Sequence, residues 1–273
     1  MRRLNYKLIV SDFDGTLIDD NQRVPEKVRN AIAEYVSNGG IFAVCTGRML
    51  RSILPQVRGL GLKGLVVAHQ GAAIADIESG NLIRCENIPY TETAEICSVI
   101  NDLSYGINAF CGDTIYSDIP KNNAGLKLYE KIIGVETTFV ESVAEHISAQ
   151  RLDCQKVAAL VEPSQRDYLY EELLKRLGSR FDVTCSAKVL VEVAKLGINK
   201  GDALKFLSGR FGVPLEKTVA IGDNLNDLSM VEVAGVGVAV ANGDKKLKEV
   251  ADFIATTNND GAVAQIIEKY GFA

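Results

Sequence analysis

The 273-residue sequence has few of the residues from which zinc sites and nucleic-acid surfaces are built. It contains only two histidines, and none of its six cysteines stands in a Cys-x-x-Cys pair, so a zinc site has almost no ligands to use. Lys and Arg (30) are fewer than Asp and Glu (35). The resulting net charge of −5 argues against a nucleic-acid partner.

Long apolar segments are also missing. No stretch reaches the length needed to cross a bilayer, and the apolar run after Arg2 and Arg3 is too short for a signal peptide. In a chain of this length without a secretory signal, cysteines are expected to be buried thiols rather than disulfides. We therefore predict a reduced, soluble, cytoplasmic protein with no membrane partner. The cysteines are Cys45, Cys85, Cys97, Cys111, Cys154 and Cys185.

The sequence does contain two carboxylates directly after an apolar segment near its start. The run Leu8–Val10 predicts a buried strand, and Ser-Asp-Phe-Asp-Gly-Thr-Leu follows it. Residues two apart on an extended chain point the same way, so Asp12 and Asp14 share a face. Two like charges there favour a hard cation such as Mg²⁺, which uses one or two carboxylates plus substrate phosphate. A surface turn is the alternative, whereas a calcium loop would need further oxygen ligands after Gly15.

The apolar pattern also indicates the domain organisation. Near the start, strands at 41–45 and 65–68 alternate with helices at 25–38 and 49–58, which is typical of a parallel sheet with crossover helices. The same alternation returns after residue 197.

Between these parts the predicted strands come in pairs. Residues 107–110 and 114–118 are predicted as adjacent strands, and 181–185 and 189–193 as two more. Paired strands favour an α+β insert with an antiparallel sheet. The fold class is therefore α/β, with a parallel-sheet core from residues 1–84 and 188–273 and an inserted domain at 85–187.

Two further candidate residues stand at predicted strand-to-helix junctions. Thr46, followed by Gly47, offers a hydroxyl and free backbone amides that suit an oxyanion, although Thr46 could instead cap the next helix. Lys200 opens a predicted helix, where a cation opposes the helix dipole. That position suits either an exposed lysine or one that neutralises a bound anion.

A second acidic motif, Ile-Gly-Asp-Asn-Leu-Asn-Asp, ends at Asp227. Asp223 follows a predicted strand, and Asp227 lies one helical turn further on, so both carboxylates can face one centre. A polar loop that caps a helix is the alternative. Because parallel sheets bind ligands at the carboxyl ends of their strands, we expect one site at this edge. Its members would be Asp12, Asp14, Thr46, Lys200, Asp223 and Asp227.

With these motifs in this order, the chain resembles the haloacid dehalogenase (HAD) superfamily, and within it the Cof-type phosphatases. The resemblance covers essentially the whole length. It implies a Rossmann-like core with a large cap domain inserted between the second and third motifs. It also implies a Mg²⁺-dependent phosphatase that hydrolyses small phosphorylated metabolites through an aspartyl phosphate. Sugar phosphates are the first expectation, pyridoxal phosphate or flavin mononucleotide the next. A sugar phosphomutase and a non-enzymatic phospho-aspartate signalling module stay open as alternatives.

The resemblance further implies a role for individual residues. Asp12 would be the nucleophile and Asp14 the general acid and base. The phosphate would be held by Thr46, Gly47, Lys200 and Asn226. The metal would be held by Asp12, the main-chain carbonyl of Asp14, Asp223 and Asp227, the last either directly or through another ligand. Many members have Asn-Gly after the third strand, whereas this chain has His69-Gln70-Gly71.

Overall fold

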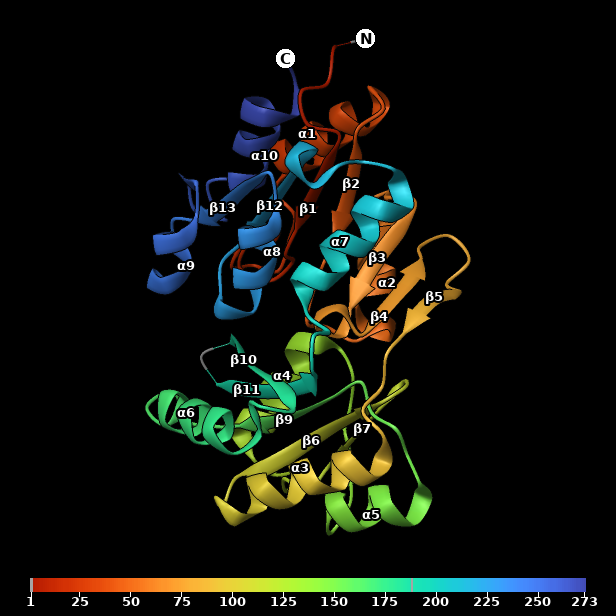
Figure 1. Ribbon diagram of the computed structural model, residues 1–273, viewed down its shortest axis with the longest axis vertical. Helices are drawn as coiled ribbons and strands as arrows, with labels where there is room; N and C mark the ends of the chain where they lie inside the picture. The colour runs from red at the N-terminus through yellow and green to blue at the C-terminus, as the bar shows by residue number, and fades with distance from the viewer. Residues whose placement is uncertain (1, 188) are drawn as a thin grey trace.

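The computed structural model describes residues 2–187 and 189–273. Two bodies are stacked along the long axis of the molecule, and both termini lie at the same end of it (Figure 1). The body with the termini is called the core, and the body formed from α3 to β11 is called the insert. Among the described residues, no helix is both long enough and apolar enough to cross a membrane.

The core is organised around a five-stranded sheet in the order β14-β13-β12-β1-β2. All four strand pairs are parallel, and β1 and β12 are neighbours although they come from opposite ends of the chain. The carboxyl ends of these strands therefore meet at one edge of the sheet. The strands are β1 (Leu8–Ser11), β2 (Ile41–Val44), β12 (Thr218–Gly222), β13 (Val236–Val240) and β14 (Phe253–Ala255).

Both faces of this sheet are covered, which is why its strands are apolar throughout. On one face, Ile9 packs in a cluster with Val28 and Ile32 of α1, and on the other Leu8 and Val10 pack with residues of α7 and α8. The helical elements of the core are α1 (Glu26–Ser37), α2 (Leu50–Gly59), η1 (His69–Gly71), α7 (Lys200–Phe211), η2 (Leu215–Lys217), η3 (Leu225–Asp227), α8 (Leu228–Val233), α9 (Lys245–Val250), α10 (Ala262–Ile266) and η4 (Ile267–Gly271). The predicted α/β core is confirmed.

A small antiparallel sheet of β3 (Leu65–Ala68), β4 (Ala73–Asp76) and β5 (Leu82–Cys85) extends the core beside β2. Within it, β4 and β5 form a hairpin. A single bridge between Cys45 and Val67 connects it to the end of β2. The chain leaves the core through β5 and enters the insert at α3 (Figure 1).

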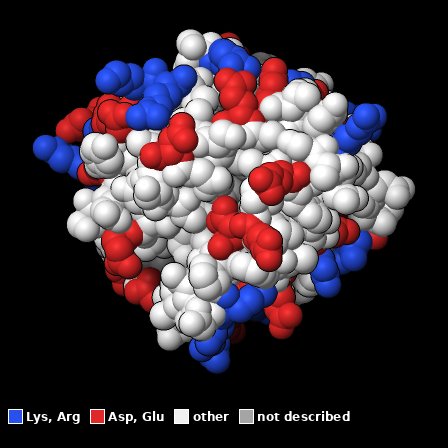
Figure 2. Space-filling view, turned by 90° about the horizontal axis from the view of Figure 1, so that it is seen from below, with Lys and Arg blue, Asp and Glu red and all other residues white. Residues whose placement is uncertain are grey.

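The insert is a six-stranded sheet in the order β10-β11-β9-β6-β7-β8, mostly antiparallel. Its strands are β6 (Gly106–Cys111), β7 (Thr114–Ser117), β8 (Thr138–Phe139), β9 (Lys156–Leu160), β10 (Phe181–Ala187) and β11 (Leu190–Lys195). Three helices share a cluster with one face, namely α3 (Tyr90–Asp102), α5 (Val143–Gln150) and α6 (Arg166–Leu177), whereas α4 (Ala124–Ile133) packs on the other. Figure 2 views this end of the molecule, where acidic side chains are scattered between basic ones and no continuous basic surface is visible.

Two sequence-based expectations change with the structure, the end of the insert and the state of the cysteines. The strand β11 pairs with both β9 and β10, so the sheet of the insert continues past the predicted boundary, and we propose residue 195 rather than 187 as its end. The expectation of six thiols is wrong, because Cys111 and Cys154 form a disulfide at adjoining ends of the paired strands β6 and β9. The other four cysteines are free.

Candidate active site

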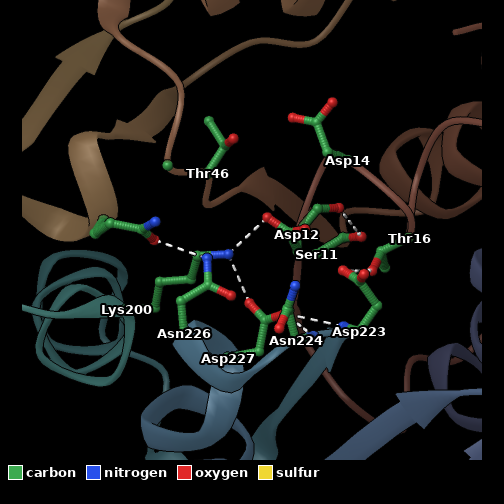
Figure 3. A network of polar contacts seen from close by, with 12 residues as sticks. Ser11, Asp12, Asp14, Thr16, Thr46, Lys200, Asp223, Asn224, Asn226 and Asp227 are labelled. Atoms are coloured by element: carbon green, nitrogen blue, oxygen red, sulfur yellow. Dashed lines mark hydrogen bonds and ion pairs between the residues drawn. The ribbon is translucent and has the colours of Figure 1, made fainter. Parts of the chain in front are cut away.

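The carboxyl ends of β1 and β12 bring four of the predicted residues together (Figure 3). Asp12 directly follows β1 and Asp223 directly follows β12. Lys200 is the first residue of α7, and Asp227 is the last of η3. Residues more than two hundred positions apart thus share one edge of the sheet, as the parallel topology requires.

Lys200 is the centre of this group. Its Nζ donates a hydrogen bond to Asp12 Oδ1 and another to Asp227 Oδ1, each at 2.6 Å. The side chain is fully buried, so the alternative of an exposed lysine is wrong. Burial alone would lower the pKa of Lys200, but the charges of Asp12 and Asp227 outweigh it and raise that pKa. Lys200 is therefore a permanent buried cation.

Asp227 uses both of its carboxylate oxygens on protein donors. Oδ1 accepts from Lys200, and Oδ2 accepts from the backbone N–H groups of Asp223 and Asn224 at 2.9 and 3.0 Å. A side chain on Gly222 would collide with Asp227, so glycine is required there. Asp227 consequently braces the loop that carries Asp223.

Three carboxylates of this group could hold a metal ion. Asp12, Asp223 and Asp227 each offer one oxygen, and these oxygens lie within 4.8 Å of one another. Burial raises the pKa of Asp12 well above its usual range, and burial with the charge of Asp227 raises the pKa of Asp223 to about 7. Crowded carboxylates of this kind fit a hard divalent cation with oxygen ligands, such as Mg²⁺. Gly15 permits the close approach of Asp223, since a side chain there would clash with it.

The carboxylate of Asp14 lies outside this acidic group and is turned away from it (Figure 3). It accepts two hydrogen bonds from Arg48, from Nε to Oδ2 at 2.7 Å and from Nη2 to Oδ1 at 2.6 Å. Arg48 is buried and also donates to Gln22 Oε1 at 3.0 Å. Arg48 was not predicted from the sequence, although a buried arginine needs an acidic partner.

Thr46 is buried after the end of β2 and does not cap α2, because the residue before that helix is Met49. The alternative of a capping threonine is therefore wrong. Thr46 Oγ1 accepts a hydrogen bond from the backbone N–H of Arg48 at 3.1 Å, so its own hydroxyl hydrogen can be donated elsewhere. The carbonyl of Gly47 accepts from Nζ of Lys156, a residue of the insert, at 2.8 Å.

Asn226 is the remaining predicted residue. Its Nδ2 donates to Gln70 Oε1 at 3.0 Å, and Gln70 in turn donates to Glu192 of the insert. Lys156 and Glu192, which also line the site, were not predicted from the sequence. The available signal was a charged residue inside or at the start of an otherwise apolar strand.

A cavity of about 690 Å³ lies between the core and the insert. Asp12, Asp14 and Thr46 line it from the core side. Leu128 and Ile132 of α4 line it from the insert side. The cavity is thus lined by charged side chains on the core side and partly by apolar side chains on the insert side.

Comparisons with known proteins agree with this architecture. Residues 9–267 match the family described as haloacid dehalogenase-like hydrolase. The phosphatase YwpJ of Bacillus subtilis is 31% identical over 293 residues, covering 96% of this chain and 99% of its own. The 5-amino-6-(5-phospho-D-ribitylamino)uracil phosphatase YcsE of the same organism is 29% identical over 268 residues, covering 98% and 96%. The crystal structure of TM0651 from Thermotoga maritima is 32% identical with a TM-score of 0.78, covering 98% of both chains. The chain therefore belongs to the haloacid dehalogenase-like hydrolase family, and it is a phosphoric monoester phosphatase.

Proposed function

We propose that the protein hydrolyses small phosphorylated metabolites with Mg²⁺ and that Asp12 is the nucleophile. One observation carries this proposal: a buried carboxylate at the end of β1 is held by a buried lysine and lines the cavity. Phosphoryl transfer depends mainly on positioning and on neutralising charge, and Lys200 supplies both for Asp12. We propose the cytoplasm as its location.

In the proposed reaction, Asp12 attacks phosphorus with the carboxylate oxygen that does not bind Lys200. The bond between phosphorus and the leaving oxygen breaks, and Asp14 gives that oxygen a proton. Water then attacks the aspartyl phosphate while Asp14 takes up its proton, which releases inorganic phosphate and restores Asp12.

The proposed metal ligands are Asp12, Asp223 and the main-chain carbonyl of Asp14. Asp227 would hold the loop of Asp223 in place without binding the metal itself, because both of its oxygens already accept hydrogen bonds. A bound Mg²⁺ would neutralise the charge that builds up between the carboxylates and the phosphate. The phosphate would be held by Lys200, the hydroxyl of Thr46, the backbone of Gly47 and the amide of Asn226.

The leaving group would occupy the insert side of the cavity. There Leu128 and Ile132 are large apolar side chains that are 59% and 44% exposed although they face a cavity. Such a wall favours an ester with a flat or apolar part, because covering these side chains is stabilising. Pyridoxal phosphate, flavin mononucleotide and ribityl-pyrimidine phosphates therefore belong beside sugar phosphates as candidate substrates.

The test is release of inorganic phosphate from a panel of these esters, with Mg²⁺ and with EDTA. We expect metal-dependent turnover that is lost in Asp12→Asn and retained in Asp102→Asn, a control at an exposed carboxylate in α3. Turnover that survives in Asp12→Asn would contradict the assignment of the nucleophile. An isomerised ester would instead identify a phosphomutase, and a long-lived phosphoprotein a signalling module.

A further inference from the structure

Two charged residues of the insert reach into the site. Lys156 begins β9, and Glu192 lies in the neighbouring strand β11. Residues two apart share a face of a strand, so these two side chains lie on the same face as Ala158 and Leu190. That face packs against Met49 of the core, whereas the opposite face lies under the helices of the insert. Lys156 and Glu192 form an ion pair, and their side chains are only 2% and 1% exposed.

Lys156 acts on the loop after β2. Its Nζ donates to the carbonyl oxygen of Gly47, and the N–H of the same peptide group, which belongs to Arg48, donates to Thr46 Oγ1. Because a peptide group is planar, holding the carbonyl also holds the N–H. The hydroxyl oxygen of Thr46 is then occupied, so its hydrogen is available to an oxygen in the cavity.

Glu192 acts on Asn226 through Gln70. Its Oε2 accepts from Gln70 Nε2 at 2.6 Å, and Gln70 Oε1 accepts from Asn226 Nδ2 at 3.0 Å. A carboxylate can only accept, so Gln70 has to turn its NH₂ group toward Glu192 and its carbonyl toward Asn226. Asn226 then has to turn its own NH₂ group toward Gln70. One acidic residue of the insert thus determines the orientation of two amides in the core.

The position of Gln70 is built for this contact. Gln70 has a φ of 60° and His69 before it a φ of 49°, both in the left-handed region that non-glycine residues rarely adopt. Gly47 lies against the Gln70 amide, and a side chain there would collide with it. Backbone and side chain together place Gln70 between Glu192 and Asn226.

We propose that the Lys156–Glu192 pair positions the phosphate-binding groups of the core. When the insert lies on the core, Lys156 sets the peptide that orients Thr46, and Glu192 sets the amide of Asn226. The inference rests on the proposed function, in which Thr46 and Asn226 bind the phosphate. Lys156 and Glu192 are positioning residues that act on the phosphoryl end of the substrate, which is common to every ester. Their removal should therefore affect all esters alike.

The test uses Glu192→Gln. The new glutamine has to keep its oxygen toward Lys156, so its NH₂ group faces Gln70 and reverses the orientation of both amides. We expect kcat/KM to fall about tenfold or more, by the same factor for 4-nitrophenyl phosphate and for larger esters. Inhibition by inorganic phosphate should weaken in parallel. A factor that depends on the leaving group would overturn the proposal, because it would place Glu192 in the leaving-group subsite.

Glu86→Gln is the matched control. Glu86 pairs with Lys195 at 2.6 Å, so the same chemical change breaks another lysine–glutamate pair of β11. This pair does not contact Thr46, Gly47, Gln70 or Asn226 among the described hydrogen bonds. We expect kcat/KM and phosphate inhibition to stay within about twofold of the wild type. A loss equal to that of Glu192→Gln would overturn the proposal.

A double-mutant cycle with Asn226→Ala separates this proposal from the function on which it rests. We expect Asn226→Ala to weaken phosphate inhibition, and Glu192→Gln to add little once Asn226 is gone. Additive losses would overturn the positioning role alone. Unchanged phosphate inhibition in Asn226→Ala would overturn the assignment of phosphate binding and the proposal with it. If Glu192→Gln does not fold, Gln70→Met cuts the same connection within the core and should give the same result.

Discussion

Arg48 holds the carboxylate of Asp14 with two parallel hydrogen bonds, Nε to Oδ2 and Nη2 to Oδ1. Such a two-bond contact fixes the plane of the carboxylate as well as its position. The guanidinium lies over the ring of Phe13, 5.0 Å from its centroid, so Arg48 is itself held. The carboxylate of Asp14 therefore has one defined orientation in the structure.

Arg48→Lys should lower kcat about tenfold, because a lysine offers a point charge and cannot reproduce the planar contact. The Mg²⁺ concentration for half-maximal activity should not change, since Arg48 contacts none of the three clustered carboxylates. Steady-state kinetics at varied Mg²⁺ will check both points, with Arg51→Lys on the exposed side of α2 as the control. An unchanged kcat would show that the orientation of Asp14 does not limit turnover.

Lys200→Met should abolish turnover and destabilise the metal-free protein. Removing this cation leaves Asp12 and Asp227 buried without their partner, which typically costs about 3–5 kcal/mol of unfolding free energy. Urea denaturation in EDTA measures the loss, and Lys205→Met on the exposed side of α7 is the control. Equal stability of Lys200→Met and wild type would contradict the view that Lys200 offsets these carboxylates.

Much of the core could be predicted because its strands are continuous apolar runs, and two of them are followed directly by an aspartate. The predicted bounds of β3 are those observed, and Asp12 and Asp223 follow strands as expected. The carboxyl-end rule for parallel sheets was enough to place Asp12 near Asp223 without any contact information. The apolar pattern of the strands and the topology of the parallel sheet agree here, so the local sequence was sufficient to predict this part of the core.

Three short elements could not be predicted, namely β8 and α5 of the insert and α9 of the core, because their apolar pattern is weak.

The contacts between the two bodies could not be predicted either. The roles of Arg48, Gln70 and Glu192 depend on hydrogen bonds to residues that are distant in the sequence. The Cys111–Cys154 disulfide depends in the same way on the pairing of β6 with β9. A single sequence carries periodicity but not these pairings.

Mg²⁺ should stabilise the protein, and less so at low pH. Burial raises the pKa of Asp223 to about 7 in the metal-free protein, so Mg²⁺ has to displace a proton below that pH. The affinity should fall up to about tenfold for each pH unit below 7. The stability of the metal-free protein depends on pH in the opposite direction. The raised pKa of Asp223 contributes stability at low pH, and this contribution is lost as the pH rises toward 7. Thermal unfolding with Mg²⁺ or EDTA at several pH values will measure both effects.

Asp223→Asn is the variant that checks this assignment. It should remove the stabilisation by Mg²⁺ and its dependence on pH, while folding in EDTA is retained because an asparagine carries no buried charge. A thermal shift by Mg²⁺ that persists in Asp223→Asn would mean that the ion binds elsewhere.

His69 should make the protein sensitive to acid. It is buried beside Phe110 of the insert, and burial, together with the charge of Lys156, lowers its pKa to about 3. The unfolded chain binds a proton near pH 6.5, so the stability contributed by neutral His69 is present above that pH and is lost as the pH falls below it. The loss is about 1.4 kcal/mol for each pH unit. In His69→Leu this dependence should be absent, so the difference in unfolding free energy between wild type and variant should change by about 2 kcal/mol between pH 6.5 and 5. Because other titrating groups are common to both proteins, a difference that stays constant over this range would show that His69 is protonated in the folded state.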